Sequence, residues 1–116
     1  MAQIDVPLSE GTNASGDIYK IEITDNLDYV VLPASNRLFT LEITGVTVDS
    51  INLYATTDST ADASAIDKQV FDKDGVTNPL IEDQVFYASH PYQKIKIEKV
   101  GGTDTLTVVV NFKNRE

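Results

Sequence analysis

The chain has 116 residues, enough for one domain with a buried core and too few for two independent ones. Nine basic residues against eighteen acidic ones give a net charge of −9, which opposes contact with nucleic-acid phosphates and with anionic membrane surfaces. No apolar run approaches the roughly 20 residues that span a bilayer, and the lack of cysteine excludes disulfides and thiolate metal sites. The composition predicts a soluble domain that binds neither nucleic acid nor membrane.

The first eight residues lack the basic start and the continuous apolar stretch of a secretory signal, which favours synthesis and retention in a cytoplasm. Ile4, Val6 and Leu8 have strand spacing, and Pro7 between them cannot donate to a ladder and is confined to a sheet edge. This pattern favours an arm that adds to a sheet edge, and we take its three apolar residues as candidate partner contacts. The alternatives are a first strand of the domain and a frayed end.

Residues 9–17 are small, polar and rich in turn formers, so they predict a linker or a long loop. We therefore divide the chain into an N-terminal arm and linker at 1–16 and a β-sandwich domain at 17–116.

From residue 18 onward, short apolar runs with a period of two recur between turn residues. These runs are 18–24, 29–32, 37–44, 50–56, 68–71, 84–88, 94–100 and 105–113. Repeated alternation predicts antiparallel sheets with one covered face. The fold class is therefore all-β, an antiparallel β-sandwich of about eight strands with jelly-roll or immunoglobulin-like topology.

The last two runs face each other in the sequence across Gly101-Gly102, which predicts a closing hairpin. Its inward residues are Ile95, Ile97, Leu106, Val108, Val110 and Phe112. Lys94, Lys96 and Lys99 supply a local basic strip on an acidic protein. We take this strip as a second candidate partner contact.

Residues 57–68 are rich in alanine and in helix-capping residues, so we expect a long loop with one helical turn. The stretch 58–83 holds seven acidic residues and two lysines and predicts a strongly negative rim.

None of the possible chemical sites is supported by a complete motif. Residues 72–75, Asp-Lys-Asp-Gly, resemble a fragment of a calcium loop, but Val70 and Ile81 occupy the first and last ligand positions, which favours a hairpin turn. His90 has no accompanying nucleophile turn, and Gly101-Gly102 precedes no helix that could receive a phosphate. We expect no catalytic residue, cofactor or metal, and no enzymatic activity.

The order of these signals resembles that of small β-sandwich accessory proteins of tailed-bacteriophage virions, in particular capsid decoration (cement) proteins. The resemblance is carried by Leu-Tyr-Ala-Thr-Thr-Asp-Ser at 53–59 with the loop after it, and by His-Pro-Tyr-Gln-Lys-Ile-Lys-Ile at 90–97, which leads through Gly-Gly-Thr at 101–103 to Leu-Thr-Val-Val-Val at 106–110. It covers residues 37–113. Lysines stand in the penultimate strand where that family usually has an arginine.

The resemblance implies a non-enzymatic virion protein that binds the capsid surface and stabilises capsomer junctions. Its partners would be the major capsid protein or another virion protein, its assembly a homotrimer, and its location the virion after synthesis in a host cytoplasm. One alternative is a carbohydrate- or receptor-binding module of a tail fibre or cell surface, with exposed tyrosines as the platform. A small hydrolase or isomerase on a β-barrel is the last alternative.

Overall fold

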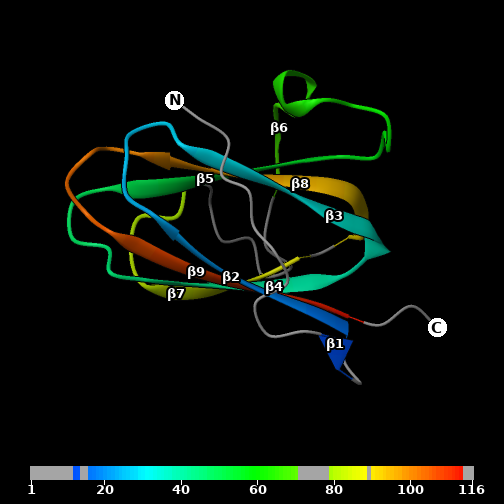
Figure 1. Cartoon of the computed structure of the whole chain (residues 1–116), viewed down its shortest axis with the longest axis horizontal. Coiled ribbons are helices and arrows are strands. Elements are labelled where there is room, and N and C mark those ends of the chain that lie inside the picture. Colours follow the sequence, from blue (N-terminus) through cyan, green and yellow to red (C-terminus); the bar gives the residue numbers. More distant parts are fainter. Residues whose placement is uncertain (1–11, 14–15, 71–78, 89, 114–116) are drawn as a thin grey trace.

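A computed structural model describes residues 12–13, 16–70, 79–88 and 90–113 (Figure 1). Within these ranges the chain forms nine strands and one short 3-10 turn, η1, at Ala63–Ala65. The strands are β1 Thr12–Asn13, β2 Gly16–Ile23, β3 Tyr29–Arg37, β4 Phe39–Thr44, β5 Ser50–Thr56, β6 Lys68–Gln69, β7 Gln84–Tyr87, β8 Tyr92–Val100 and β9 Leu106–Phe112. No helix in this part of the chain is both long and apolar enough to cross a membrane.

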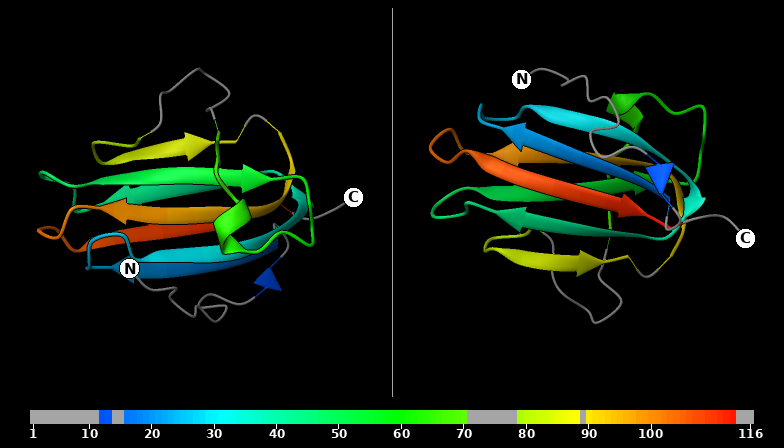
Figure 2. Two further views of the ribbon diagram at one scale, coloured as in Figure 1. Left: turned by 90° about the horizontal axis from the view of Figure 1, so that it is seen from above. Right: turned by 60° about the horizontal axis from the view of Figure 1, so that its bottom comes forward.

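The strands form two antiparallel sheets that pack face to face (Figures 1 and 2). The five-stranded sheet has the order β1-β2-β9-β4-β7, and the four-stranded sheet has the order β3-β8-β5-β6. The predicted all-β antiparallel sandwich is therefore confirmed.

The strand pairing resolves the topology that the sequence left open. β2 pairs with β9, β3 with β8, β4 with β7 and β5 with β6, so the chain is one long antiparallel hairpin rolled into two layers. Every connection from β2 onward, except that between β5 and β6, passes from one sheet to the other. This is the jelly-roll arrangement and not the immunoglobulin-like one.

The predicted closing hairpin is wrong. β8 pairs with β3 and β5, whereas β9 pairs with β2 and β4 in the opposite sheet. Residues 101–105 are therefore a crossover between the layers. Alternation in a sequence identifies the buried face of a strand, but it does not identify the strand beside it.

Apolar side chains from the inner faces of both sheets form one core. The six residues predicted to point inward from β8 and β9 are all fully buried. Aromatic rings fill one part of this core: the Phe39 and Phe112 ring centroids lie 5.7 Å apart, and Tyr19 meets Phe112 edge-on at 5.9 Å. Both spacings lie in the range at which aromatic pairs attract each other.

Four connecting segments gather at one end of the sandwich, which we call the loop end (Figure 2). They are 24–28, 45–49, 79–83 and 101–105. Hydrogen bonds join neighbouring segments: the Gly101 N–H donates to Asn26 Oδ1 at 2.8 Å, and the Val46 N–H donates to Asp83 Oδ1 at 2.8 Å. The loop at 57–67 and the start of β8 are not part of the loop end.

Candidate functional site

The structure describes three of the six candidate contact residues. Ile4, Val6 and Leu8 lie outside the described residues. Residues 12–13, which fall in the predicted linker, form β1 against β2. Lys94, Lys96 and Lys99 all lie on β8, but they do not form a common strip.

Lys94 and Lys96 hold the loop at 57–67 against the outer face of the four-stranded sheet. Lys94 Nζ donates to the Ala61 carbonyl at 2.8 Å, and Lys96 Nζ donates to the Ala63 carbonyl at 3.2 Å. The Lys96 ammonium also lies 4.8 Å from the Tyr29 ring centroid, within the range of a cation–π contact. These two lysines therefore fix the loop at 57–67 on the sheet.

The prediction that Lys99 belongs to this strip is wrong, because its side chain is fully buried. Lys99 shares the inward parity of Ile95 and Ile97, whereas Lys94 and Lys96 have the opposite parity. Its Nζ pairs with Asp49 Oδ2 at 2.8 Å and also donates to the carbonyls of Thr24 and Gly101. A buried ammonium is tolerated here because oxygen atoms surround it.

Asp49 and Asp104 organise the loop end around Lys99. Asp49 Oδ2 accepts from the N–H groups of Thr103 at 2.8 Å and Asp104 at 2.6 Å. Asp104 Oδ2 accepts from the N–H groups of Thr47, Val48 and Asp49 at 2.8 to 2.9 Å, and the Thr47 hydroxyl donates to Oδ1.

These bonds stabilise the ionised carboxylates. The bond from the Thr47 hydroxyl, followed by the backbone donors, holds the pKa of Asp104 well below its usual range. The Lys99 ammonium, followed by the Asp104 N–H, lowers the pKa of Asp49. Both groups are therefore charged at neutral pH, and the 45–49 loop is fixed around them.

The loop end is acidic and displays two exposed apolar side chains. Its four segments contain six carboxylates and no lysine, arginine or histidine. Asp49 and Asp104 are buried, whereas Asp25, Glu82 and Asp83 are exposed. Val48 is 72% exposed and Ile81 is 69% exposed. This combination makes the loop end a candidate surface for a positively charged protein partner.

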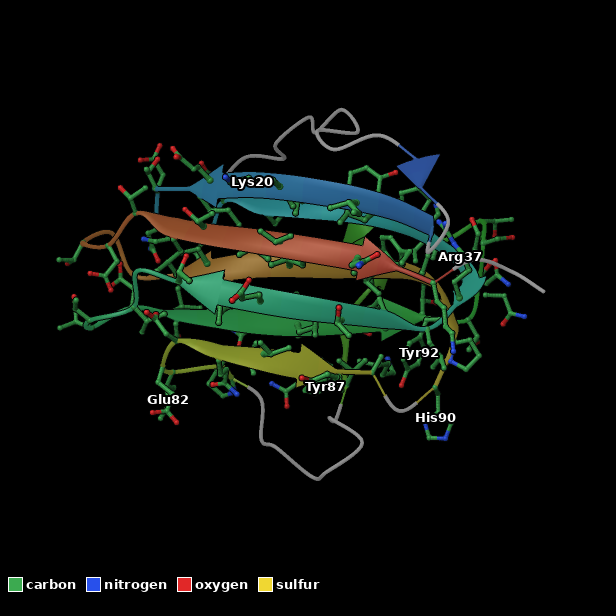
Figure 3. The ribbon with its side chains drawn as sticks, turned by 90° about the horizontal axis from the view of Figure 1, so that it is seen from below. Lys20, Arg37, Glu82, Tyr87, His90 and Tyr92 are labelled. Atoms are coloured by element: carbon green, nitrogen blue, oxygen red, sulfur yellow. The ribbon has the colours of Figure 1, made fainter. Side chains whose placement is uncertain are left out.

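The predicted single acidic rim is divided in two. Glu82 and Asp83 lie at the loop end, whereas Asp58 and Asp62 lie in the loop at 57–67 that Lys94 and Lys96 hold. Figure 3 shows Glu82 at the end of the sandwich opposite to Arg37, His90 and Tyr92. Bonds from Thr60 lower the pKa of Asp58, and bonds from Ser64 and Ala65 lower that of Asp62. No group of three or more potential metal ligands occurs within the described ranges, and residues 72–75 lie outside them.

A cleft of about 340 Å³ lies on the outer face of the five-stranded sheet, away from the loop end. Its lining residues are Leu38, Phe39, Thr40, Tyr87, Ala88, Asn111 and Lys113. Asn111 Oδ1 is buried there without a hydrogen-bond partner. Figure 3 shows Tyr87 between Glu82 and His90 along this edge of the sandwich. The cleft is the second candidate surface.

Sequence reasoning identified part of the loop end, because Glu82 and Asp83 belong to the predicted acidic rim, and it missed the cleft. The spacing of β8 gives Lys99 the same parity as Ile95 and Ile97, which indicates an inward-pointing lysine but not its partner. The partner Asp49 lies in the connection β4–β5, and its identity depends on the strand order. The cleft joins residues from β4, β7 and β9, which are distant in the sequence.

No protein-family model and no curated protein matches the chain. Among solved structures, the chain is similar to PliG of Aeromonas hydrophila, a periplasmic inhibitor of g-type lysozyme. The two share 14% sequence identity with a TM-score of 0.58, and the match covers 97% of this chain and 96% of PliG. At this identity the likeness concerns the fold, and it extends over nearly the whole length of both chains.

This comparison corrects the predicted function. The similar structure is a bacterial periplasmic inhibitor and not a virion protein. The predicted capsid decoration protein, with a capsid protein as its partner and a homotrimer as its assembly, is therefore wrong. The alternative, a carbohydrate- or receptor-binding module of a tail fibre or cell surface, stays a prediction. The predicted location on a virion depends on the same resemblance and stays a prediction.

Proposed function

We propose that this protein is a non-enzymatic module that binds a positively charged protein and blocks it, with g-type lysozyme as the first partner to test. The observation that supports this function most directly is the surface charge of the loop end, where Asp25, Glu82 and Asp83 are exposed and the four segments contain no basic residue. The fold shared with a protein that binds a lysozyme gives the proposal its partner class.

The exposed charge of the loop end affects the association rate and the choice of partner. A surface of one sign attracts a partner of the opposite sign during diffusion and repels partners of the same sign. The carboxylates of Asp25, Glu82 and Asp83 are exposed, so salt screens them over about 8 Å at physiological ionic strength. Association should therefore slow as salt is added, with a smaller change in the dissociation rate.

The test is a titration of the purified protein against g-type lysozyme, followed by peptidoglycan hydrolysis and by surface plasmon resonance at several salt concentrations. We expect inhibition that saturates at one inhibitor per enzyme and an association rate that falls with salt. A basic protein without glycan-cleaving activity is the control for unspecific attraction. Equal affinity for that control, or no binding to lysozyme, contradicts the proposed function.

Paired charge variants locate the effect. Asp25→Asn/Glu82→Gln removes two charges from the loop end, and Glu22→Gln/Glu42→Gln removes two exposed charges from the outer face of the five-stranded sheet. Both pairs change the net charge equally, so a difference between them reports where the charges lie. If the partner approaches the loop end, the first pair should slow association severalfold more than the second pair. An equal effect of the two pairs would place the attraction in the net charge and not in the loop end.

A further inference from the structure

Two exposed apolar side chains stand at the loop end on segments that are joined to each other. Val48 and Ile81 are 72% and 69% exposed, whereas the exposed apolar residues on the sheet strands are 37% to 42% exposed. The Val46 N–H donates to Asp83 Oδ1 at 2.8 Å, so the segments that carry the two side chains are held together. Scattered exposed apolar residues are ordinary, but here two protrude from adjoining turns.

The turn that carries Val48 is ordered before any partner arrives. Three consecutive N–H groups, of Thr47, Val48 and Asp49, donate to the same Asp104 oxygen. Asp104 itself is buried at 8% exposure. Ordering a flexible loop on binding costs affinity, and a loop already held in one conformation avoids that cost.

The charges around the two side chains select the occupant. Asp25, Glu82 and Asp83 are exposed nearby in the same set of segments. A second copy of this chain would bring the same carboxylates against them, and like charges brought together at an interface disfavour the contact. A protein with a basic rim around an apolar hollow is complementary in both charge and shape.

We propose that Val48 and Ile81 are apolar anchors that the loop end inserts into a concave, positively rimmed site of its protein partner. This inference rests on the proposed function and adds the contact surface. Asp104 is a positioning residue, because it acts through the backbone of the 45–49 loop. The cleft at Tyr87 is then not the main contact.

The experiment measures the Kd for g-type lysozyme of the wild type and of two double variants. Val48→Ala/Ile81→Ala truncates the anchors, and Leu38→Ala/Tyr87→Ala truncates two exposed residues of the cleft. The anchor variant should raise Kd at least about tenfold, as loss of buried anchor side chains does, and the cleft variant should raise it less than about threefold. Both pairs are surface substitutions, and circular dichroism with thermal unfolding checks that each variant is folded.

The outcomes separate this inference from the proposed function. Wild-type protein that fails to bind lysozyme overturns the proposed function and this inference with it. Wild-type binding with an unchanged Kd for the anchor variant overturns the inference alone, and a loss in the cleft variant moves the contact to the cleft. Sedimentation of the free protein completes the set, because a dimer abolished by Val48→Ala/Ile81→Ala would identify a second copy as the occupant.

Thr47→Val tests the positioning role. It removes the hydroxyl bond to Asp104 Oδ1 and keeps the three backbone bonds to Oδ2. We expect faster amide exchange at Thr47, Val48 and Asp49, with a rise in Kd smaller than that of the anchor variant. Unchanged exchange together with a weakened Kd would place Thr47 in the contact itself and overturn the assigned role.

Discussion

Asp49 and Asp104 each accept a hydrogen bond from the backbone of the other. The Asp104 N–H donates to Asp49 Oδ2 at 2.6 Å, and the Asp49 N–H donates to Asp104 Oδ2 at 2.9 Å. The two residues belong to the connections β4–β5 and β8–β9, both of which pass from one sheet to the other. Their reciprocal bonds therefore tie the two layers together at the loop end.

Gly101 lies against this pair and cannot carry a side chain. Its φ is +106°, and a Cβ at this position would lie 2.1 Å from Asp49 Oδ1. We expect Gly101→Ala to lower the free energy of unfolding by more than about 1 kcal/mol, measured by urea denaturation. Gly102→Ala is the matched control, because the nearest atom to its Cβ would be Asn26 Cβ at 3.9 Å. Equal losses in the two variants would show that the contact with Asp49 is unimportant.

The two carboxylates make stability depend on pH in the acid range. Their pKa values are lowered in the folded protein, whereas an unfolded aspartate titrates at about 3.9. A lowered folded pKa gives stability that is present above the unfolded pKa and is lost as pH falls through the folded pKa. We expect thermal unfolding midpoints to fall steeply below about pH 4.

Asp104→Asn should flatten this acid dependence, because an amide does not titrate. It should also lower stability at pH 7, because the amide NH2 group is a donor and cannot accept the hydrogen bonds that one Asp104 oxygen accepts. Asp25→Asn, at an exposed turn position, should leave the shape of the curve close to that of the wild type. Parallel curves for wild type and Asp104→Asn between pH 2 and pH 7, roughly the range in which a carboxylate titrates, would refute the assignment.

Lys99→Met should be strongly destabilising at neutral pH. It keeps the volume of the side chain but leaves the Asp49 carboxylate without its ammonium partner at 2.8 Å. Loss of one member of a buried pair costs about 3 kcal/mol or more. The loss should shrink at low pH, where Asp49 is protonated in the variant. Lys113→Met, at an exposed position, is the control, and a loss that does not change with pH would contradict the pairing.

The strand positions could be predicted because they depend on local alternation. The expected run 50–56 coincides with β5, whereas the run 29–32 covers only the first part of β3, which extends to Arg37. The other expected runs lie close to their strands where the structure describes them. The predicted helical turn in 57–68 occurs as η1. Local pattern sets which side chains point inward, and it is indifferent to the order of strands in a sheet.

The candidate sites could not be predicted for the same reason. Residues 101–105 read as a hairpin turn, yet they form a crossover, because the partner of β9 is β2 and not β8. The ion pair joins Lys99 on β8 to Asp49 in the connection β4–β5, and it depends on β5 lying beside β8 in the four-stranded sheet. The loop end is assembled by these long-range contacts, which the local alternation in β8 and β9 does not reveal.

The loop at 57–67 should open when its lysine contact is removed. Lys96→Met removes the 3.2 Å bond to the Ala63 carbonyl and the contact with the Tyr29 ring. We expect faster amide exchange at Ala65 and Ile66, whose N–H groups bond within the same turn, and a stability loss of about 1 kcal/mol. Lys68→Met is the control, since its pair with Asp67 is exposed and worth little. Equal exchange in both variants would remove the assigned role of Lys96.

Asn111 offers a substitution that should stabilise the protein. Its Oδ1 is buried without a hydrogen-bond partner, which carries a desolvation cost in the folded state. It lies in β9 opposite Ile18 of β2 and Thr40 of β4, where a β-branched residue is favoured. Asn111→Val should raise the free energy of unfolding by about 0.5 to 1 kcal/mol in urea denaturation. Thr107→Val, on the same face of β9, controls for the gain from an apolar side chain on this face, and an equal gain in both would show that the unpaired oxygen is not the cause.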